Sequence, residues 1–190
     1  MIRIFCSNIK SIVLPVLLLY FLLPAGIASG QTTPHSKGEI MKQFHQDQAI
    51  TLFNQSWDLL LKEGRTRADE DMLLNMVHAS LHHWRQIGEP INVLRGEWMI
   101  CHVYTLLGHK EASLYHAQNV LRLMEVQSPV DWDLAYCYEA MARTQALLGN
   151  RDEFQKYYDL AVKAGKDIAD PESRQQLETD LNDGFWFGMR

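Results

Sequence analysis

Residues 104–152 read YTLLGHKEASLYHAQNVLRLMEVQSPVDWDLAYCYEAMARTQALLGNRD. Within this stretch Leu106-Leu107-Gly108 recurs as Leu147-Leu148-Gly149, 41 residues later. Each copy ends an amphipathic run and is followed by a short polar turn and a second amphipathic run. Because a glycine directly after an apolar periodic run is typical of a helix C-terminus, the stretch predicts two-helix units that repeat along the chain.

Glycine and proline divide the rest of the chain in the same way. Gly64 and Gly88 follow amphipathic runs, while Pro90, Pro129 and Pro171 stand where helices begin. The predicted helices are 39–62, 69–87, 91–107, 110–126, 131–148, 151–165 and 171–182. Short turns imply antiparallel neighbours, so we predict an all-α fold of antiparallel helix pairs, stacked as a short α-solenoid of about seven helices. The segment 131–148, rich in small residues and aromatics, should be the most buried.

The pattern resembles a degenerate tetratricopeptide repeat. Tyr104-x-x-Leu107-Gly108 fits the aromatic-x-x-Leu-Gly element of that family, and Ala161 falls where its second-helix alanine belongs. The departures are the longer period and the residues Asp152, Gly165 and Val120. The resemblance implies a concave surface that receives a peptide or a partner protein. The segments HASLHHW (78–84) and AYCYEAMAR (135–143) also look like a family of bacterial proteins with no assigned activity, which implies a shared fold and no function.

The first 30 residues have the three regions of a secretory signal peptide. Arg3 and Lys10 give a basic start, residues 11–23 are almost wholly apolar, and small residues follow as far as Gly30. A retained membrane anchor is the alternative, although the apolar run is short for spanning a bilayer. We expect residues 1–30 to be a cleaved signal peptide, 31–38 a flexible lead-in, 39–183 the helical repeat domain and 184–190 an aromatic tail. The predicted location is periplasmic or secreted, with no stable membrane insertion after cleavage.

The charge of the chain argues against nucleic acid as a partner. The net charge is −5, and removal of residues 1–30 takes away two basic and no acidic residues, which gives −7. No basic patch remains in the sequence to neutralise phosphates.

Cys101 and Cys137 are the two cysteines after residue 30. Both lie in apolar helical patterns, where a thiol usually behaves as a small hydrophobic group. In an oxidising compartment they could also pair, and the sequence leaves a disulfide open.

Two groups of residues are candidates for binding a partner. Arg95, Trp98 and His102 lie on one helix at spacings that allow a wall for a planar or anionic group, although Trp98 could equally fill a helix interface. Glu139 and Arg143 are four residues apart in the order that favours an intrahelical ion pair. A buried brace is the simpler interpretation, and an Arg143 free to bind a peptide carboxylate is the alternative.

Six of the eight histidines lie between positions 78 and 116. His78 and His82 are four residues apart on one helix face, a spacing that allows two imidazoles to reach one metal ion. Glu97 or Glu139 could complete such a site, but a solvated polar face explains the pattern equally, so these two histidines are only weak candidates. His83 lies on the apolar side, where we expect a core histidine bonded to a backbone carbonyl. No metal and no cofactor are predicted.

The hypothesis favoured by the sequence is a non-enzymatic interaction module that binds a peptide or protein in a groove lined by the second and third helices. No nucleophile motif or phosphate-binding loop is visible. The alternative is a metal-binding or small-molecule-processing enzyme that uses the histidine-rich region of the second to fourth helices. A homodimeric scaffold is a third hypothesis. The tail Gly184–Gly188 either caps the last helices or serves as an exposed docking peptide.

Overall fold

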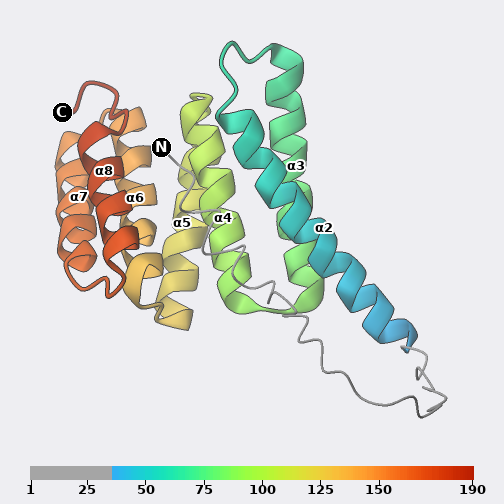
Figure 1. The fold of residues 1–190 in the computed structure, drawn as a ribbon. Coiled ribbons are helices and arrows are strands. Elements are labelled where there is room, and N and C mark those ends of the chain that lie inside the picture. Colours follow the sequence, from blue (N-terminus) through green and yellow to red (C-terminus); the bar gives the residue numbers. More distant parts are fainter. Residues whose placement is uncertain (1–35) are drawn as a thin grey trace, which may run out of the picture.

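The computed structural model of the protein describes residues 36–190, which form seven α-helices and no strand (Figure 1). Every helix boundary lies within two residues of the sequence-based prediction, so the all-α class is confirmed. The signal peptide predicted for residues 1–30, and the lead-in as far as residue 35, lie outside the described residues. The helices are α2 (Lys37–Leu60), α3 (Arg67–Ile87), α4 (Pro90–Leu106), α5 (Lys110–Gln127), α6 (Asp131–Leu148), α7 (Arg151–Gly165) and α8 (Pro171–Asp183).

The helix ends follow from local side-chain chemistry. Ser36 with Glu39, and Thr66 with Asp69, form capping boxes at the starts of α2 and α3. Gly88 and Gly149 adopt left-handed conformations at the ends of α3 and α6, with φ of 77° and 84°, a region that glycine enters without steric cost. Pro129 lies two residues before α6, which begins at Asp131 as predicted.

Helices adjacent in the chain pack against each other from α2 to α8, and α6 also contacts α4 and α8. The two innermost helices are therefore α4 and α6, which bury more residues than the other described helices. The prediction that 131–148 is the most buried helix is confirmed. Its alanines at positions 135, 142 and 146 are 2% exposed or less, and such small side chains allow close packing of the neighbouring helices. None of the described helices is long and apolar enough to cross a membrane.

A hydroxyl network joins α4, α5 and α6 in the interior. The hydroxyl of Ser113 lies 2.6 Å from that of Thr105 and 2.8 Å from that of Thr144, and Thr144 also contacts the Cys101 thiol at 3.4 Å. All four side chains are buried. Cys101 and Cys137 are free thiols, and burial raises their pKa values to about 11 and about 12. They act here as interior packing residues.

The substitution Thr144→Val tests the contribution of this network. Valine keeps the size of the side chain but leaves Ser113 and Cys101 without their shared partner, so the free energy of unfolding should fall by about 1–3 kcal/mol. Thr51→Val, at an exposed position of α2, is the matched control and should change it by less than about 0.5 kcal/mol. Chemical denaturation measures both values. If Thr144→Val and Thr51→Val change the free energy of unfolding equally, the hydroxyl network does not stabilise the protein.

Candidate functional site

The structure brings four of the five predicted binding residues together on α4 and α6. The indole N–H of Trp98 donates to Glu139 Oε2 at 3.3 Å. The His102 ring stacks on Trp98, with ring centroids 5.2 Å apart and an interplanar angle of 16°. Arg143, one turn beyond Glu139, is close enough to His102 to affect its protonation. On α2, Trp57 packs against both Trp98 and His102, with centroids at 6.1 and 5.9 Å.

Arg143 is committed to internal partners. Its Nε and Nη2 atoms lie 2.5 Å from Glu139 Oε1, and its Nη1 donates to the carbonyl of Phe185 at 3.4 Å. Its guanidinium also lies 4.7 Å from the centre of the Trp186 ring. The predicted i,i+4 ion pair is therefore present and buried, as the brace interpretation requires. An Arg143 free to bind a peptide carboxylate does not fit these contacts.

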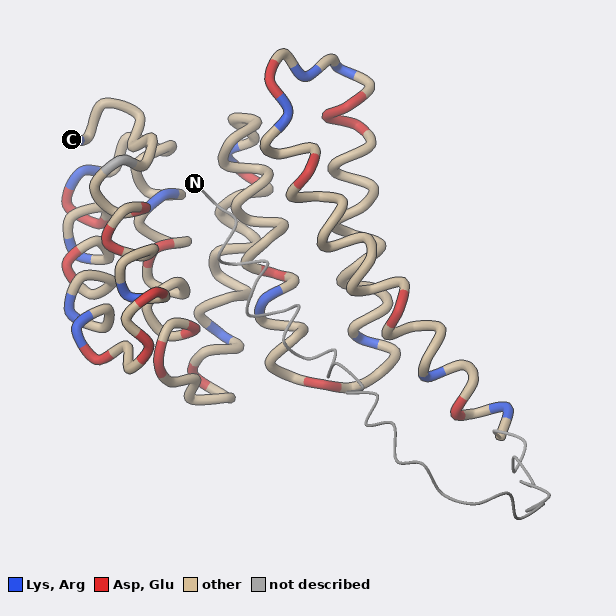
Figure 2. The backbone as a smooth tube through the Cα atoms, in the orientation of Figure 1, with Lys and Arg blue, Asp and Glu red and all other residues tan. Residues whose placement is uncertain are grey.

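The fifth residue, Arg95, has partners that the sequence did not indicate. Its Nε and Nη2 atoms each donate to one carboxylate oxygen of Asp133 at 2.9 Å, and the guanidinium lies 4.4 Å from the centre of the Trp132 ring. Asp133 and Trp132 are nearly 40 residues from Arg95 in the chain, so no local spacing pairs them. Arg95 and Glu97 are the charged residues of α4, and the helix carries no Lys, Arg, Asp or Glu after Glu97 (Figure 2).

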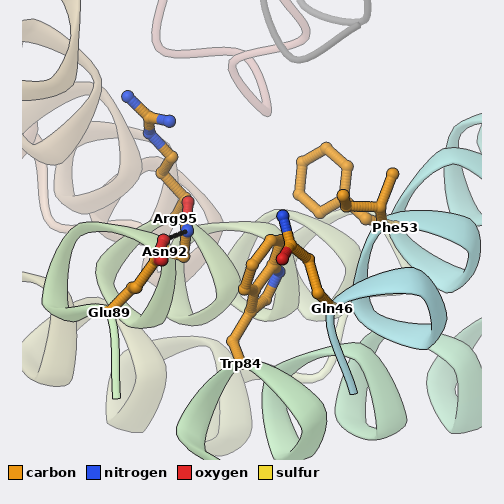
Figure 3. Close-up of a pocket in the computed structure, with 7 residues that line it drawn as sticks. Gln46, Phe53, Trp84, Glu89, Asn92 and Arg95 are labelled. Carbon is orange, nitrogen blue, oxygen red and sulfur yellow. Dashed lines mark hydrogen bonds between the residues drawn. The ribbon is translucent and has the colours of Figure 1, made fainter. Parts of the chain in front are cut away.

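Arg95 lies between two cavities on this side of α4. The larger has a volume of about 40 Å³, with Phe53 and Trp84 forming its apolar walls and Gln46, Asn92 and Arg95 polar parts of its lining (Figure 3). The smaller, about 10 Å³, lies between α4 and α6; its lining residues are Leu94, Arg95, Trp98, Trp132, Asp133, Tyr136 and Cys137. The groove was predicted to be lined by the second and third helices, α3 and α4. The larger cavity is lined by α2 and α4 together with Trp84 of α3, and the smaller one by α4 and α6.

His102 carries an unsatisfied polar atom at this site. Its Nδ1 is buried and has no hydrogen-bond partner within residues 36–190. Burial, and then the positive charge of Arg143, lower the pKa of His102 to about 3. The ring is therefore neutral at pH 7 and keeps one nitrogen able to accept and one able to donate. A buried polar atom without a partner is destabilising by about 1–3 kcal/mol, which a ligand atom at this position would relieve.

Acidification should destabilise the protein through His102. An unfolded histidine titrates near pH 6.5, so between about pH 6.5 and pH 3 the unfolded chain binds a proton that folded His102 does not. Stability is therefore lost as the pH falls through this window, by up to about 1.4 kcal/mol per pH unit. His102→Phe keeps a stacking ring that does not titrate, and should lose less stability than wild type between about pH 7 and pH 5. Denaturation at both pH values measures this, and parallel losses in the two proteins would contradict it.

His78 and His82, the two weak candidates for metal ligands, are engaged with different partners. His78 Nε2 lies 2.9 Å from the Tyr104 hydroxyl, and the ring of His82 packs edge-on against that of His83. Glu139 belongs to the Trp98 contact on α4 and α6, so it cannot complete a site with His78. Within residues 36–190 there is no group of three His, Cys, Asp or Glu side chains arranged to hold a metal ion.

Glu97 is the centre of the histidine-rich region. Its carboxylate, 1% exposed, accepts from Arg85 at 2.5 Å, from His116 Nδ1 at 2.7 Å and from Asn119 at 3.3 Å. Burial alone would raise the pKa of Glu97, but the hydrogen bonds of His116 and Asn119 and the charges of His116 and Arg85 lower it below its ordinary value. The contacts join α3, α4 and α5 through one carboxylate. Sequence reasoning considered Glu97 only as a metal ligand and missed this role.

Two further predictions are resolved by the geometry. Within residues 36–190, the hydrogen-bond partner of His83 is a side chain and not the expected backbone carbonyl: its Nδ1 lies 2.8 Å from Nδ1 of His45 on α2. In the tail, Trp186 is 3% exposed and packs on Phe154 and Tyr158, whereas Phe185 is 64% exposed. The capping interpretation of the tail therefore holds for Trp186.

Comparison with known proteins does not extend this description. No protein family matches the chain, and neither a curated protein nor a solved structure matches it.

Proposed function

We propose that the protein is an exported helical-repeat module of the tetratricopeptide type, in which antiparallel helix pairs stack as a short α-solenoid and one face binds a peptide segment of a partner protein. The proposed binding face comprises Phe53 and Trp57 on α2, Arg95, Trp98 and His102 on α4, and the smaller cavity between α4 and α6. The export part rests on the signal-like sequence of residues 1–30.

Support for the repeat comes from contacts one period apart. Trp98 and Glu139 are separated by 41 residues, the spacing of the two Leu-Leu-Gly elements, and their side chains touch. In a stack of repeats, equivalent positions of successive first helices lie side by side. The contact between α4 and α6, which skips α5, fits the same arrangement.

The observation that carries the binding proposal is the unpartnered Nδ1 of His102, which lies in an aromatic setting of Trp57 and Trp98. A neutral imidazole there can exchange a hydrogen bond with a peptide amide or carbonyl. Two small cavities flank Arg95, one turn away from Trp98, and the larger has apolar walls for a short aliphatic side chain. A peptide with an apolar side chain next to exposed backbone polar groups matches this combination.

The test is selection of peptides from a random library on the immobilised full chain, followed by titrations with tryptophan fluorescence. Selected peptides should bind His102→Phe at least about tenfold more weakly than wild type, a difference of about 1.4 kcal/mol. Arg122→Ala, an exposed arginine on α5, is the matched control and should leave the affinity within about twofold. The proposal fails if no peptide is enriched, or if the His102→Phe and Arg122→Ala variants bind equally.

The enzymatic alternative has one observation in its favour, the Glu97–His116 pair. A buried carboxylate that orients an imidazole is a common element of general-base sites. The described residues place no serine or cysteine nucleophile against His116, whose ring contacts instead involve Tyr104, Tyr115 and His78. Binding on the α4 face therefore has the stronger support.

A further inference from the structure

His45 on α2 and His83 on α3 form a histidine pair on the side of α2 that faces α3. Their Nδ1 atoms are 2.8 Å apart, with ring centroids 5.1 Å apart and an interplanar angle of 47°. Both side chains are partly exposed. The two residues are separated by 38 positions, so only the packing of the two helices brings them together.

The surrounding contacts hold this pair in place. One turn away, the buried hydroxyl of Ser80 donates to the carbonyl of Ala49 at 2.8 Å, and Ala49, fully buried, lets α2 and α3 approach closely. The ring of Phe44 packs edge-on against both imidazoles, with centroids at 5.5 and 5.8 Å. The distance between the two histidines is therefore set by the helix packing and does not depend on two free surface side chains meeting.

The contact between the two Nδ1 atoms contains one proton, because one nitrogen must donate and the other must accept. When that proton moves to Nε2 of the same ring, both histidines stay neutral and each has an Nδ1 lone pair that can bind a metal ion. With metal–nitrogen bonds of about 2.0–2.1 Å, nitrogens 2.8 Å apart subtend about 85–90° at a shared ion. A tetrahedral zinc site would need about 3.3–3.4 Å. An angle near 90° suits two adjacent positions of a square-planar or tetragonal site, the geometry of copper(II) and nickel(II).

We propose that His45 and His83 form a binding site for a divalent late transition-metal ion, with copper(II) the preferred occupant. Each histidine binds the ion through its Nδ1 atom. The described residues offer no third metal-binding side chain, so water molecules complete the coordination. Copper(II) binds nitrogen ligands more tightly than the other divalent ions of its row. His82 packs edge-on against His83, but the three histidines do not form a group that could hold one ion together. The site is separate from the proposed peptide-binding face.

The experiment is titration of the full chain with copper(II), read by calorimetry and by electron paramagnetic resonance. We expect one tight ion per chain whose spectrum shows two imidazole nitrogens. Loss of a second-shell partner already weakens metal binding by about 10–100-fold, so loss of a ligand in His45→Ala or His83→Ala should weaken it at least about tenfold. All variants keep the same N-terminus, so any copper bound there contributes equally to each.

His82→Gln is the matched control, since it removes an exposed histidine from the same helix and leaves the pair intact. Circular dichroism checks that each variant is folded, and thermal unfolding gives a second measurement. Copper(II) should raise the Tm of wild type and of His82→Gln but not of the ligand variants, because only a folded pair binds the ion. The proposal is overturned if His83→Ala binds copper as tightly as wild type, or if His82→Gln loses as much affinity as His83→Ala.

Discussion

Replacement of Arg143 by methionine is expected to lower the free energy of unfolding by about 3–5 kcal/mol. Methionine fills much of the space of the arginine stem but leaves the carboxylate of Glu139, 1% exposed, without its ion-pair partner. The carbonyl of Phe185 and the ring of Trp186 lose contacts as well. An uncompensated buried charge is far more costly than the loss of a surface ion pair.

Chemical denaturation of two further variants shows whether the effect comes from the charge. In the double variant Glu139→Leu with Arg143→Met both charges are gone, so we expect most of the lost stability to return. Lys156→Ala removes the exposed i,i+3 pair with Glu153, whose side chains are about half exposed, and should change stability by less than about 1 kcal/mol. A double variant no more stable than Arg143→Met alone would show that packing of the arginine stem, and not its charge, is what stabilises α6.

The helices could be predicted because their signals are local. Gly88 and Gly149 mark helix ends that require a left-handed residue. The capping boxes of Ser36 and Thr66 are equally local but were not used, and α2 and α3 begin two residues before the predicted starts. The Glu139–Arg143 pair was predictable for the same reason, since i and i+4 lie on one helix face. Such signals depend only on neighbours in the chain.

The rest of the site depends on helix packing, which local patterns do not contain. Arg95 meets Asp133, and His45 meets His83, at separations of 38 residues, while Trp98 meets Glu139 at 41. The two separations between α4 and α6 lie near the 41-residue period of the Leu-Leu-Gly elements, whereas His45 and His83 meet across the adjacent helices α2 and α3. The period could therefore have suggested that α4 and α6 meet. It does not show which side chains touch, because turning one helix about its axis by the angle between successive residues places different side chains at the interface. His78, a weak candidate for a metal site, likewise has partners that its own helix does not reveal, namely Tyr104 and His116.

The second large effect is expected for Trp186→Ala, which should lower the free energy of unfolding by about 3–5 kcal/mol. The ring is 3% exposed and packs on Phe154 and Tyr158 with centroids at 5.5 and 5.4 Å. Its indole N–H donates to the carbonyl of Leu181 at 3.1 Å, near the end of α8. Alanine would leave a cavity between α7 and α8 and remove the ring that lies beside Arg143.

Phe185→Ala is the matched control, because it removes a neighbouring aromatic side chain that is 64% exposed. Its carbonyl, which accepts from Arg143, belongs to the backbone and is kept, so the change should be below about 0.5 kcal/mol. Thermal and chemical denaturation of both variants measure the difference. If Trp186→Ala is as stable as Phe185→Ala, the tail does not cap α7 and α8, and the docking-peptide interpretation regains support. If the difference is as large as expected, Trp186 covers apolar surface of α7 and α8 that would otherwise be exposed to water.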